Sequence, residues 1–391
     1  MPRKGLEKGE GGWGEEGNNL SSKGFSLFPP ALISFTKTYM LSEFRALNWR
    51  NCERVRLQFE RKNLLIGPNG SGKSNLLEAI GFLGVLRSFR TVRIGELIRE
   101  DCADFVLRGV WQEPKRSPLE LEVGMNRSGE RRLLVNRQNE NSGRNFIQYF
   151  YPVVFAPEDM ELVTGAPAVR RRFFDMLASQ LDDGYINVLH DYHKALKLRN
   201  VLLKNPRRCD VAQLEVYEGL LAFAGADLNQ RRRNCIEHFN CILQDLTGRS
   251  SKLTMEYMPQ SGESPEENLE QFTRNRKREM EKRTTLCGCH LDDFRLCSHG
   301  KSMKGFASNG QNRMAALNCK SASARMIMRK RGAEHLLVLV DDVTGELDKF
   351  HREEFYELIA PAGQQFFTFT AHPGEEFFAD AQTVKLPLDP A

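Results

Sequence analysis

A glycine-rich stretch near the start of the chain constrains its fold more than any other feature. It fits the pattern G-x-x-x-x-G-K-[ST] of a phosphate-binding loop. Residues 63–66 before it are predicted to form a short buried strand, and the apolar residues after it recur at helical spacing to about residue 88. Strand, glycine loop and helix in this order predict a site for the phosphates of a nucleotide. The stretch comprises Gly67, Pro68, Asn69, Gly70, Ser71, Gly72, Lys73 and Ser74, and Asn75 follows it.

The residue types in this loop match the needs of a bound triphosphate. Glycines let the backbone turn its N–H groups toward an anion, and the N-terminus of a helix adds a partial positive charge. Lys73 is expected to reach the β- and γ-phosphates, and the Ser74 hydroxyl is expected to hold Mg²⁺. The alternative is a glycine-rich turn that matches by chance, but it leaves the two matching flanks unexplained.

A second motif lies late in the chain. Five apolar residues, 336–340, run into Asp341 and Asp342, which predicts a fully buried strand with carboxylates at its end. Beside a phosphate loop, Asp341 would hold Mg²⁺ and Asp342 would orient or deprotonate an attacking water. The alternative is a buried strand capped by two solvated aspartates.

The distance between the two motifs predicts an inserted domain, because Asp341 follows Ser74 by 267 positions. Residues 41–66 are predicted to form two strands around a turn, residues 104–135 an antiparallel sheet, and residues 168–283 mainly helices. We therefore expect an α/β fold with mixed sheets. Residues 40–167 and 286–391 would be the halves of a P-loop ATPase head, and residues 168–285 a mainly helical insertion.

The composition of the chain narrows the class of protein without identifying a function. A formal charge of +5 permits nucleic-acid binding without establishing it. Nine cysteines without a framework spacing favour reduced thiols and a cytoplasmic setting. An apolar run of about 18 residues is missing, so we expect no membrane span. Residues 1–39 are expected to be a disordered extension, with the fold beginning near Met40.

Two further segments between and after the motifs suggest the class of ATPase. Ser308, Asn309, Gly310 and Gln311 precede an expected helix, where a serine and a glycine backbone offer another anion site. Taken alone, S-x-G-Q is a common chance match. About 30 residues before the acidic strand, it looks like the signature of ABC ATPases. Residues 345–348 would then be their D-loop, and His372 their switch histidine.

With these pieces assembled, residues 40 to about 370 resemble the RecF family of ABC-type ATPases. The resemblance rests on the phosphate loop with the arginine segment after it, on residues 155–175, on residues 192–204, and on residues 340–348. The chain departs from the family pattern at 288–293, where a proline and an arginine are missing. Further departures are Leu198 and Asn309, each where glutamine is usual, and Gly345, where serine is common.

The resemblance implies an ATP-switched clamp with Mg²⁺ as cofactor. Two copies would form a homodimer that holds two ATP molecules, each between the phosphate loop of one copy and Ser308, Gly310 and Gln311 of the other. The closed dimer would bind gapped or double-stranded DNA and junctions, and slow hydrolysis would reopen it. The family acts with the mediators RecO and RecR to load recombinase, and no membrane partner is expected.

Basic residues supply the candidate DNA contacts, which should be made mainly to phosphates. For each run, the alternative is a solvated helix face with interspersed acids, and the arginines at 170–172 have the further alternative of bracing Glu158 or Asp159. The candidates are Arg87, Arg90, Arg93, the runs 170–172 and 231–233, and the cluster 274–283. Separately, Cys287, Cys289, His290, Cys297 and His299 are potential zinc ligands, but zinc sites usually place two residues between paired cysteines.

Three other functions remain as alternatives. A DNA-organising ATPase of the SMC type would need coiled coils of hundreds of residues, far more than the insertion offers. A small-molecule phosphotransferase would lack the signature and the D-loop. A degenerate head that binds ATP without hydrolysing it is compatible with the departures from the family pattern.

Overall fold

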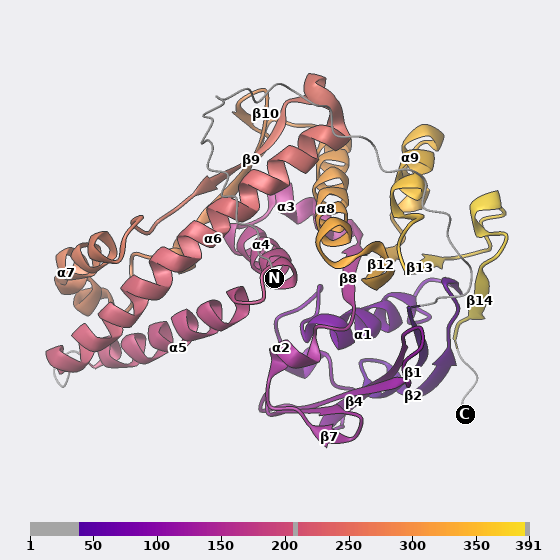
Figure 1. Ribbon diagram of the computed structural model, residues 1–391, viewed down its shortest axis with the longest axis horizontal. Helices are drawn as coiled ribbons and strands as arrows, with labels where there is room; N and C mark the ends of the chain where they lie inside the picture. The colour runs from indigo at the N-terminus through magenta and orange to yellow at the C-terminus, as the bar shows by residue number, and fades with distance from the viewer. Residues whose placement is uncertain (1–38, 206–209, 388–391) are drawn as a thin grey trace, which may run out of the picture. The chain divides into compact units, whose positions relative to one another are not determined.

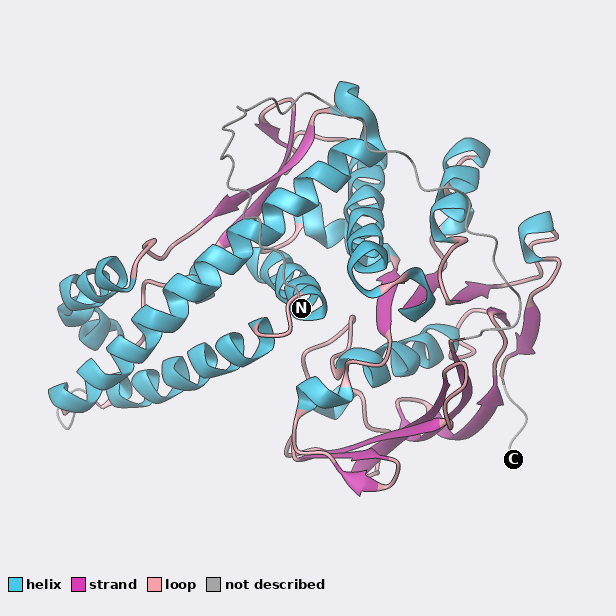
Figure 2. Ribbon diagram, viewed as in Figure 1, coloured by secondary structure: helices cyan, strands magenta, loops and turns pink. Residues whose placement is uncertain are grey.

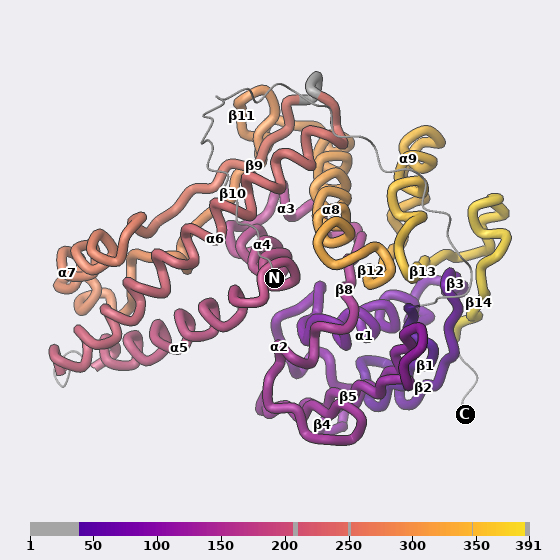
Figure 3. Tube along the Cα trace, viewed as in Figure 1, coloured from indigo at the N-terminus to yellow at the C-terminus, as the bar shows by residue number. Residues whose placement is uncertain are grey.

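The computed structural model describes residues 39–205 and 210–387, and its central element is a sheet of five parallel strands. Their order is β14-β3-β13-β12-β8. Figure 3 shows that β3 and β14, from opposite ends of the described chain, lie side by side. The strands are β3 (Lys62–Ile66), β8 (Tyr151–Phe155), β12 (Leu336–Asp341), β13 (Gln364–Phe369) and β14 (Gln382–Lys385).

A second, antiparallel sheet is built almost entirely from residues before 140. Its order is β2-β1-β4-β5-β6-β7, and Figure 2 shows its long strands near helix α1. The strands are β1 (Met40–Trp49), β2 (Cys52–Gln58), β4 (Asp104–Gln112), β5 (Leu119–Asn126), β6 (Arg131–Val135) and β7 (Gln138–Asn139).

Helix α1 (Lys73–Val85) lies between these two sheets. Its buried residues share one apolar cluster with Phe44 and Phe105 of the antiparallel sheet and with Leu65 and Leu339 of the parallel sheet. Successive strand residues point to opposite faces, so the neighbouring Leu64 packs on the other side of the parallel sheet. This alternation places α1 on one face of the parallel sheet. The loop before α1 lies at the carboxyl end of that sheet because it directly follows β3.

The other face of the parallel sheet is covered by helices, several of them from the second half of the chain. They share a cluster with Leu64, Val338 and Phe367. The helices are α3 (Glu161–Thr164), α4 (Pro167–Leu181), α8 (Asn309–Arg331) and α9 (Lys349–Ile359), while the short α2 (Gly143–Phe146) follows the antiparallel sheet. Short 3-10 helices are η1 (Ile94–Glu96), η2 (Pro157–Met160), η4 (Cys289–Leu291), η5 (Ala333–His335), η6 (Thr344–Glu346) and η7 (Glu376–Phe378).

Three helices of the predicted insertion pack on one another and form an arm (Figure 1). They share a third apolar cluster that includes Tyr185, Leu221 and Phe272. They are α5 (Tyr185–Lys204), α6 (Val211–Ser251) and α7 (Pro265–Lys282). Helix α6 is interrupted at Gly248, which has a φ of 70°.

A small antiparallel sheet connects the arm to the later part of the chain. Strand β9 (Leu253–Met258) pairs with β10 (Asp293–Ser298), which also pairs with β11 (Lys301–Ser302). The pairing of β9 with β10 therefore crosses the boundary expected at residue 285, and it ties the helical segment to the C-terminal half.

Most predicted elements are present, with one clear error. The expectation of only two strands over residues 41–66 was wrong, because the structure has three. The strand predicted at 63–66 is present as β3, but it is separate from β2. Asn63 explains the extra break: its side chain accepts a hydrogen bond from the Glu60 N–H at 2.9 Å and donates one to the Glu60 carbonyl at 2.6 Å. The expectation of a disordered extension at 1–39 lies outside the described residues, except for Tyr39. In the described part of the chain, no helix combines the length and apolar character needed to cross a membrane.

Candidate functional site

The phosphate loop joins β3 to α1 in a backbone shape that requires glycine. Gly70 and Gly72 have φ angles of 80° and 95°, in the region that L side chains rarely adopt. At Gly67, a Cβ would lie 2.3 Å from the Leu386 carbonyl oxygen, so even a methyl group is excluded. Pro68 and Asn69 lie at the exposed tip of the loop.

The loop forms a cradle whose polar groups suit a bound phosphate. Lys73 Nζ donates hydrogen bonds to the carbonyl oxygens of Gly67 at 2.7 Å and Pro68 at 2.9 Å, so its ammonium lies over the loop. The Ser71 hydroxyl is buried and has no hydrogen-bond partner among the described residues. An orphaned donor, a lysine and a glycine backbone at a helix N-terminus together fit the phosphates of a nucleotide.

The predicted magnesium residues come together beside this cradle. The Ser74 hydroxyl donates to Asp341 Oδ1 at 2.9 Å, and the Thr368 hydroxyl donates to the same oxygen at 2.9 Å. Burial raises the pKa of Asp341, while these two hydrogen bonds act in the opposite direction. A hydroxyl and a buried carboxylate in contact are the oxygen ligands that Mg²⁺ prefers.

Asp342 occupies a different position from its neighbour. It is exposed, has a φ of 54°, and its backbone N–H donates to the Thr368 hydroxyl at 3.0 Å. The left-handed backbone turns the chain at the end of β12 and separates the two carboxylates.

A charged pair that the sequence did not place at the site also lies here. Arg90 Nη1 donates to Asn75 Oδ1 at 2.9 Å, and Arg90 Nε lies 3.7 Å from Glu158. Glu158 raises and Arg90 lowers the pKa of Asp341, so both charges act on that carboxylate. Arg90, a candidate DNA contact in the sequence, is therefore engaged on the helix that follows the phosphate loop.

Sequence reasoning did not place Thr368 and Glu158 at the site, although each has a local sequence feature that points to it. Thr368 is a polar residue inside a buried apolar strand next to the acidic strand. Glu158 follows β8, which is parallel to β12 and ends at the same edge of the sheet. Their roles depend on the strand order, which the sequence does not state.

The signature segment begins α8 and is exposed. Ser308 is the N-cap: its hydroxyl accepts from the Gln311 N–H at 3.3 Å, and Gln311 Oε1 accepts from the Ser308 N–H at 2.9 Å. This reciprocal capping box holds the segment in a defined shape. A Cβ on Gly310 would meet nothing within 4 Å, so the described chain itself leaves this position open.

The expected D-loop, residues 345–348, and the expected switch histidine, His372, lie after β12 and β13 respectively. Asp348 is the N-cap of α9 and accepts hydrogen bonds from the His351 N–H at 3.0 Å and from His351 Nδ1 at 2.7 Å, which lower its pKa. Gly345 is exposed, and a Cβ there would meet no neighbour within 4 Å. His372 follows β13, is exposed, and accepts a hydrogen bond from the Gly374 N–H at 3.1 Å.

Two of the arginines expected to contact DNA are instead buried in ion pairs. Arg170 pairs with Asp293 at 2.8 Å and not with Glu158 or Asp159. Arg232 is 3% exposed and pairs with Asp175 at 2.8 Å and Asp292 at 2.7 Å. The DNA-contact prediction was wrong for these two residues, because their guanidinium groups join α4 and α6 to the start of β10 and the residue before it.

Other predicted contacts are only partly exposed and are already paired. Arg231 pairs with Asp227 at 2.6 Å, and Arg233 pairs with Glu263 at 2.8 Å. In α7, Arg276 pairs with Glu218 at 2.6 Å. Pairing with carboxylates lowers the net charge that these faces offer to a phosphate.

The segment 288–293, where the chain departs from the family pattern, is well connected. Asp292 is buried and accepts hydrogen bonds from Tyr257 at 2.5 Å and the Gln260 N–H at 2.7 Å. His290 Nδ1 lies 3.0 Å from the Tyr192 hydroxyl, and burial lowers the pKa of His290 to about 4. This segment therefore connects α5 to β9 through side-chain hydrogen bonds.

The same segment does not form a zinc site. Burial raises the pKa of both Cys287 and Cys289 to about 12. Within residues 39–205 and 210–387, no three His, Cys, Asp or Glu side chains are grouped as metal ligands.

Comparison with known proteins assigns the family. The model of the RecF/RecN/SMC N terminal domain matches residues 39–385. The DNA replication and repair protein RecF of Lactobacillus johnsonii is 33% identical over 348 residues, covering 84% of this chain and 92% of the relative. RecF of Bacillus cereus strain G9842 is 34% identical over 362 residues, covering 88% and 96%.

Solved structures agree with this result. The recombination mediator protein RecF with ATP, of the RecFOR pathway, superposes with a TM-score of 0.79 at 30% identity, covering 87% of this chain and 94% of that one. The complex named RecF-ATPrS gives a TM-score of 0.78 at 29% identity, covering 90% and 97%. The ABC-type head fold predicted from the sequence is thereby confirmed. The chain belongs to the RecF family of DNA replication and repair proteins.

Proposed function

We propose that this chain is an ATP-switched, DNA-binding protein of recombinational repair. The observation that carries the proposal is the contact between Ser74 and Asp341 beside a phosphate cradle with an orphaned Ser71 hydroxyl. The RecF relatives and the ATP-bound RecF structure support the same reading.

In this proposal, the loop from Gly67 to Ser74 holds ATP. Its backbone N–H groups, Lys73 and Ser71 bind the phosphates, and Ser74 and Asp341 supply oxygen ligands for Mg²⁺. Bound Mg²⁺ neutralises charge that develops on the phosphates during hydrolysis. The exposed Asp342 orients or deprotonates the attacking water.

A second copy of the chain completes each site. Ser308, Gly310 and Gln311 are exposed, and the capping box between Ser308 and Gln311 holds the segment in a defined shape. The open space at Gly310 supports this, since the described chain gives no steric reason for glycine there. ATP would thus join two copies, each contributing its signature to the other's nucleotide.

The closed dimer binds gapped or double-stranded DNA, and slow hydrolysis releases it. Partners of the RecO and RecR type would then load recombinase on the exposed strand. The support is the description of the related solved protein as a recombination mediator of the RecFOR pathway.

ATP-dependent DNA binding tests the proposal directly. Fluorescence anisotropy of labelled gapped DNA should rise with native protein in ATP and Mg²⁺, and should rise far less without nucleotide or with Lys73→Ala. Equal binding with and without ATP would refute the switch. ATP binding without any phosphate release over hours would instead identify a head that has lost turnover.

A further inference from the structure

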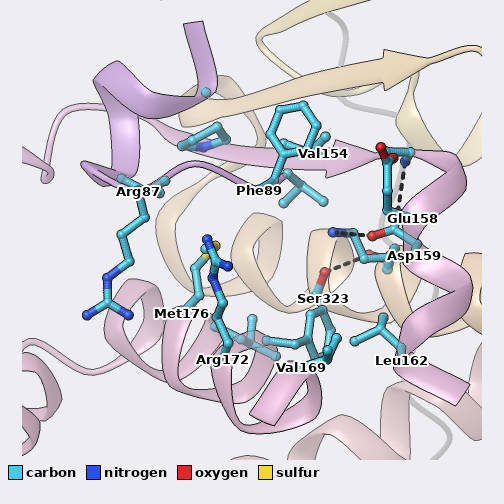
Figure 4. Close-up of a pocket in the computed structure, with 18 of the residues that line it drawn as sticks. Arg87, Phe89, Val154, Glu158, Asp159, Leu162, Val169, Arg172, Met176 and Ser323 are labelled. Carbon is cyan, nitrogen blue, oxygen red and sulfur yellow. Dashed lines mark hydrogen bonds and ion pairs between the residues drawn. The ribbon is translucent and has the colours of Figure 1, made fainter. Parts of the chain in front are cut away.

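Four arginines gather where the C-terminal end of α1 approaches α4, and we call them the arginine cluster: Arg87, Arg131, Arg171 and Arg172. Arg87 and Arg172 line a cavity of about 170 Å³, and with Arg171 they line a neighbouring cavity of about 400 Å³. In Figure 4, Arg87 and Arg172 lie at one end of the smaller cavity, and Glu158 and Asp159 lie at the other.

Arg131 comes from the antiparallel sheet and reaches the same place. A Cβ built on Gly143 would lie 3.1 Å from Arg131 Nη2 and 3.6 Å from Leu86 Cδ1, so the guanidinium lies near the end of α1. The charge of Arg87 acts on both Arg131 and Arg172. Side chains from three separate elements thus converge on one region.

The arginine cluster lacks the carboxylate partners that other arginines of this protein have. The side chains of Arg87 and Arg131 make no hydrogen bond or ion pair with any residue that the structure describes. Arg171 donates to the Asp292 carbonyl at 2.6 Å, and Arg172 donates to the Ser88 carbonyl, both uncharged acceptors. Of the residues lining the larger cavity, Asp175 is a carboxylate, and Arg232 already holds it at 2.8 Å.

The positive charges of the arginine cluster are therefore not neutralised by carboxylates in direct contact with them. Burial lowers the pKa of Arg171 and Arg172, and a neighbouring arginine lowers each further. Nearby carboxylates act in the opposite direction on both residues, but none of those that the structure describes forms an ion pair with either guanidinium. By contrast, the carboxylate of Glu122 raises the pKa of Arg108. Clustered like charges that are partly withdrawn from water are unfavourable until an anion joins them.

We propose that the arginine cluster binds backbone phosphates of DNA. The inference rests on the proposed function and names the surface that would carry it. The guanidinium groups are spread over two neighbouring cavities instead of converging on one point, which suits successive phosphates of a strand better than a single free anion. Planar guanidinium groups are well matched to phosphate oxygens.

The position of the arginine cluster also connects it to the nucleotide site. Arg172 holds the Ser88 carbonyl, and the Ser88 hydroxyl donates to Glu78 of α1. Two residues further, Arg90 binds Asn75 in the first turn of α1 at 2.9 Å. The segment between Arg87 and Arg90 therefore contacts both the arginine cluster and the helix that begins at the phosphate loop.

The test compares two double variants with equal changes in charge. Arg87→Gln/Arg131→Gln removes the two arginines without partners, so the fold should be retained. Arg132→Gln/Arg137→Gln is the matched control, because these exposed arginines pair with Glu122 and Glu120, which Arg108 also contacts. Anisotropy of labelled gapped DNA is measured in ATP and Mg²⁺ over a series of salt concentrations.

We expect the first variant to bind DNA roughly tenfold more weakly, with a slope of log affinity against log salt that is smaller by about 1 to 2. The control should match the native protein, and both variants should bind ATP normally. If the first variant matches the native affinity and slope, the inference is wrong while the proposed function stands. If the native protein binds no DNA in ATP, the proposed function itself fails.

Inorganic phosphate separates DNA from a small anion as the occupant. Titration calorimetry with phosphate alone should give the same result for the native protein and for Arg87→Gln/Arg131→Gln in the low millimolar range, because phosphate that binds is expected at the loop from Gly67 to Ser74. Saturable binding that Arg87→Gln/Arg131→Gln abolishes, together with unchanged DNA affinity, would assign the site to a free phosphate and overturn the proposal.

Discussion

The Ser74 hydroxyl lies 2.9 Å from Asp341 Oδ1, although the two residues are 267 positions apart. The contact exists because β3 and β12 lie on either side of β13 in the parallel sheet. Thr368 of β13 donates to the same oxygen and completes the arrangement. Three strands thus bring together a phosphate loop and a buried carboxylate that the chain separates by the whole arm.

Burial of Asp341 predicts an effect on stability. Because its pKa is raised, the folded protein binds a proton at this carboxyl more tightly than the unfolded chain does. The ionised carboxylate therefore destabilises the nucleotide-free fold once the pH exceeds the folded pKa. Asp341→Asn keeps an acceptor oxygen for Ser74 and Thr368 and should raise the thermal midpoint at neutral pH.

The pH dependence checks this explanation. The stability difference between Asp341→Asn and the native protein should shrink as the pH falls and Asp341 becomes protonated. ATP hydrolysis should fall in the variant, because a Mg²⁺ ligand is lost. A variant that is less stable than the native protein at neutral pH would show that burial of this charge is compensated.

Replacing Lys73 should remove nucleotide binding without harming the fold. The ammonium now binds two loop carbonyls, and each charge-assisted hydrogen bond to a phosphate contributes about 1.5–3 kcal/mol. Lys73→Ala should therefore weaken ATP binding by roughly tenfold or more in calorimetry. Lys197→Ala, an exposed position on α5, is the control. Unchanged affinity in Lys73→Ala would mean that the nucleotide lies elsewhere.

Asp342→Asn should separate ATP binding from hydrolysis. Asparagine tolerates the left-handed backbone that this position requires, since Asp342 has a φ of 54°. Loss of a general base typically lowers turnover by about 10²–10⁴-fold. Phosphate release should fall by that order while ATP affinity stays the same. Ordinary turnover in the variant would assign the role to another group, with Glu158 as the nearest candidate.

Arg232 should matter for stability and not for DNA. Removing one partner of a buried ion pair typically costs about 3–5 kcal/mol, and Arg232 holds both Asp175 and Asp292. Arg232→Met should lower the free energy of unfolding by that amount in denaturant titrations. Arg233→Met, at the half-exposed neighbouring position, should change it by less than about 1 kcal/mol. Similar small effects in both variants would contradict the structural role given to Arg232.

The sequence predicted the parts of the site that depend on local pattern. The loop at Gly67 to Ser74, the buried strand ending in Asp341 and the capped helix after Ser308 each carry their signal within a few residues. The strand order was not predictable in this way. Thr368 and Glu158 belong to the site because β13 and β8 are the neighbours of β12, which no local pattern records.

Charged residues were harder to interpret than the motifs. Arg170 and Arg232 lie in basic runs that read as exposed, yet both pair with aspartates more than 50 positions away. Arg87 carries the same kind of signal and has no partner among the described residues. Only the tertiary positions of the carboxylates distinguish these cases, because the energy of an arginine depends on what faces it.

Light scattering shows whether ATP joins two copies of the chain across the signature. The native chain, of 44.7 kDa, should double in mass with ATP and Mg²⁺ and return to the single mass when nucleotide is removed. Ser308→Arg should bind ATP and stay monomeric, because a bulky cation replaces the exposed N-cap. A native mass that does not change with ATP, or a Ser308→Arg protein that still dimerises, would contradict the account.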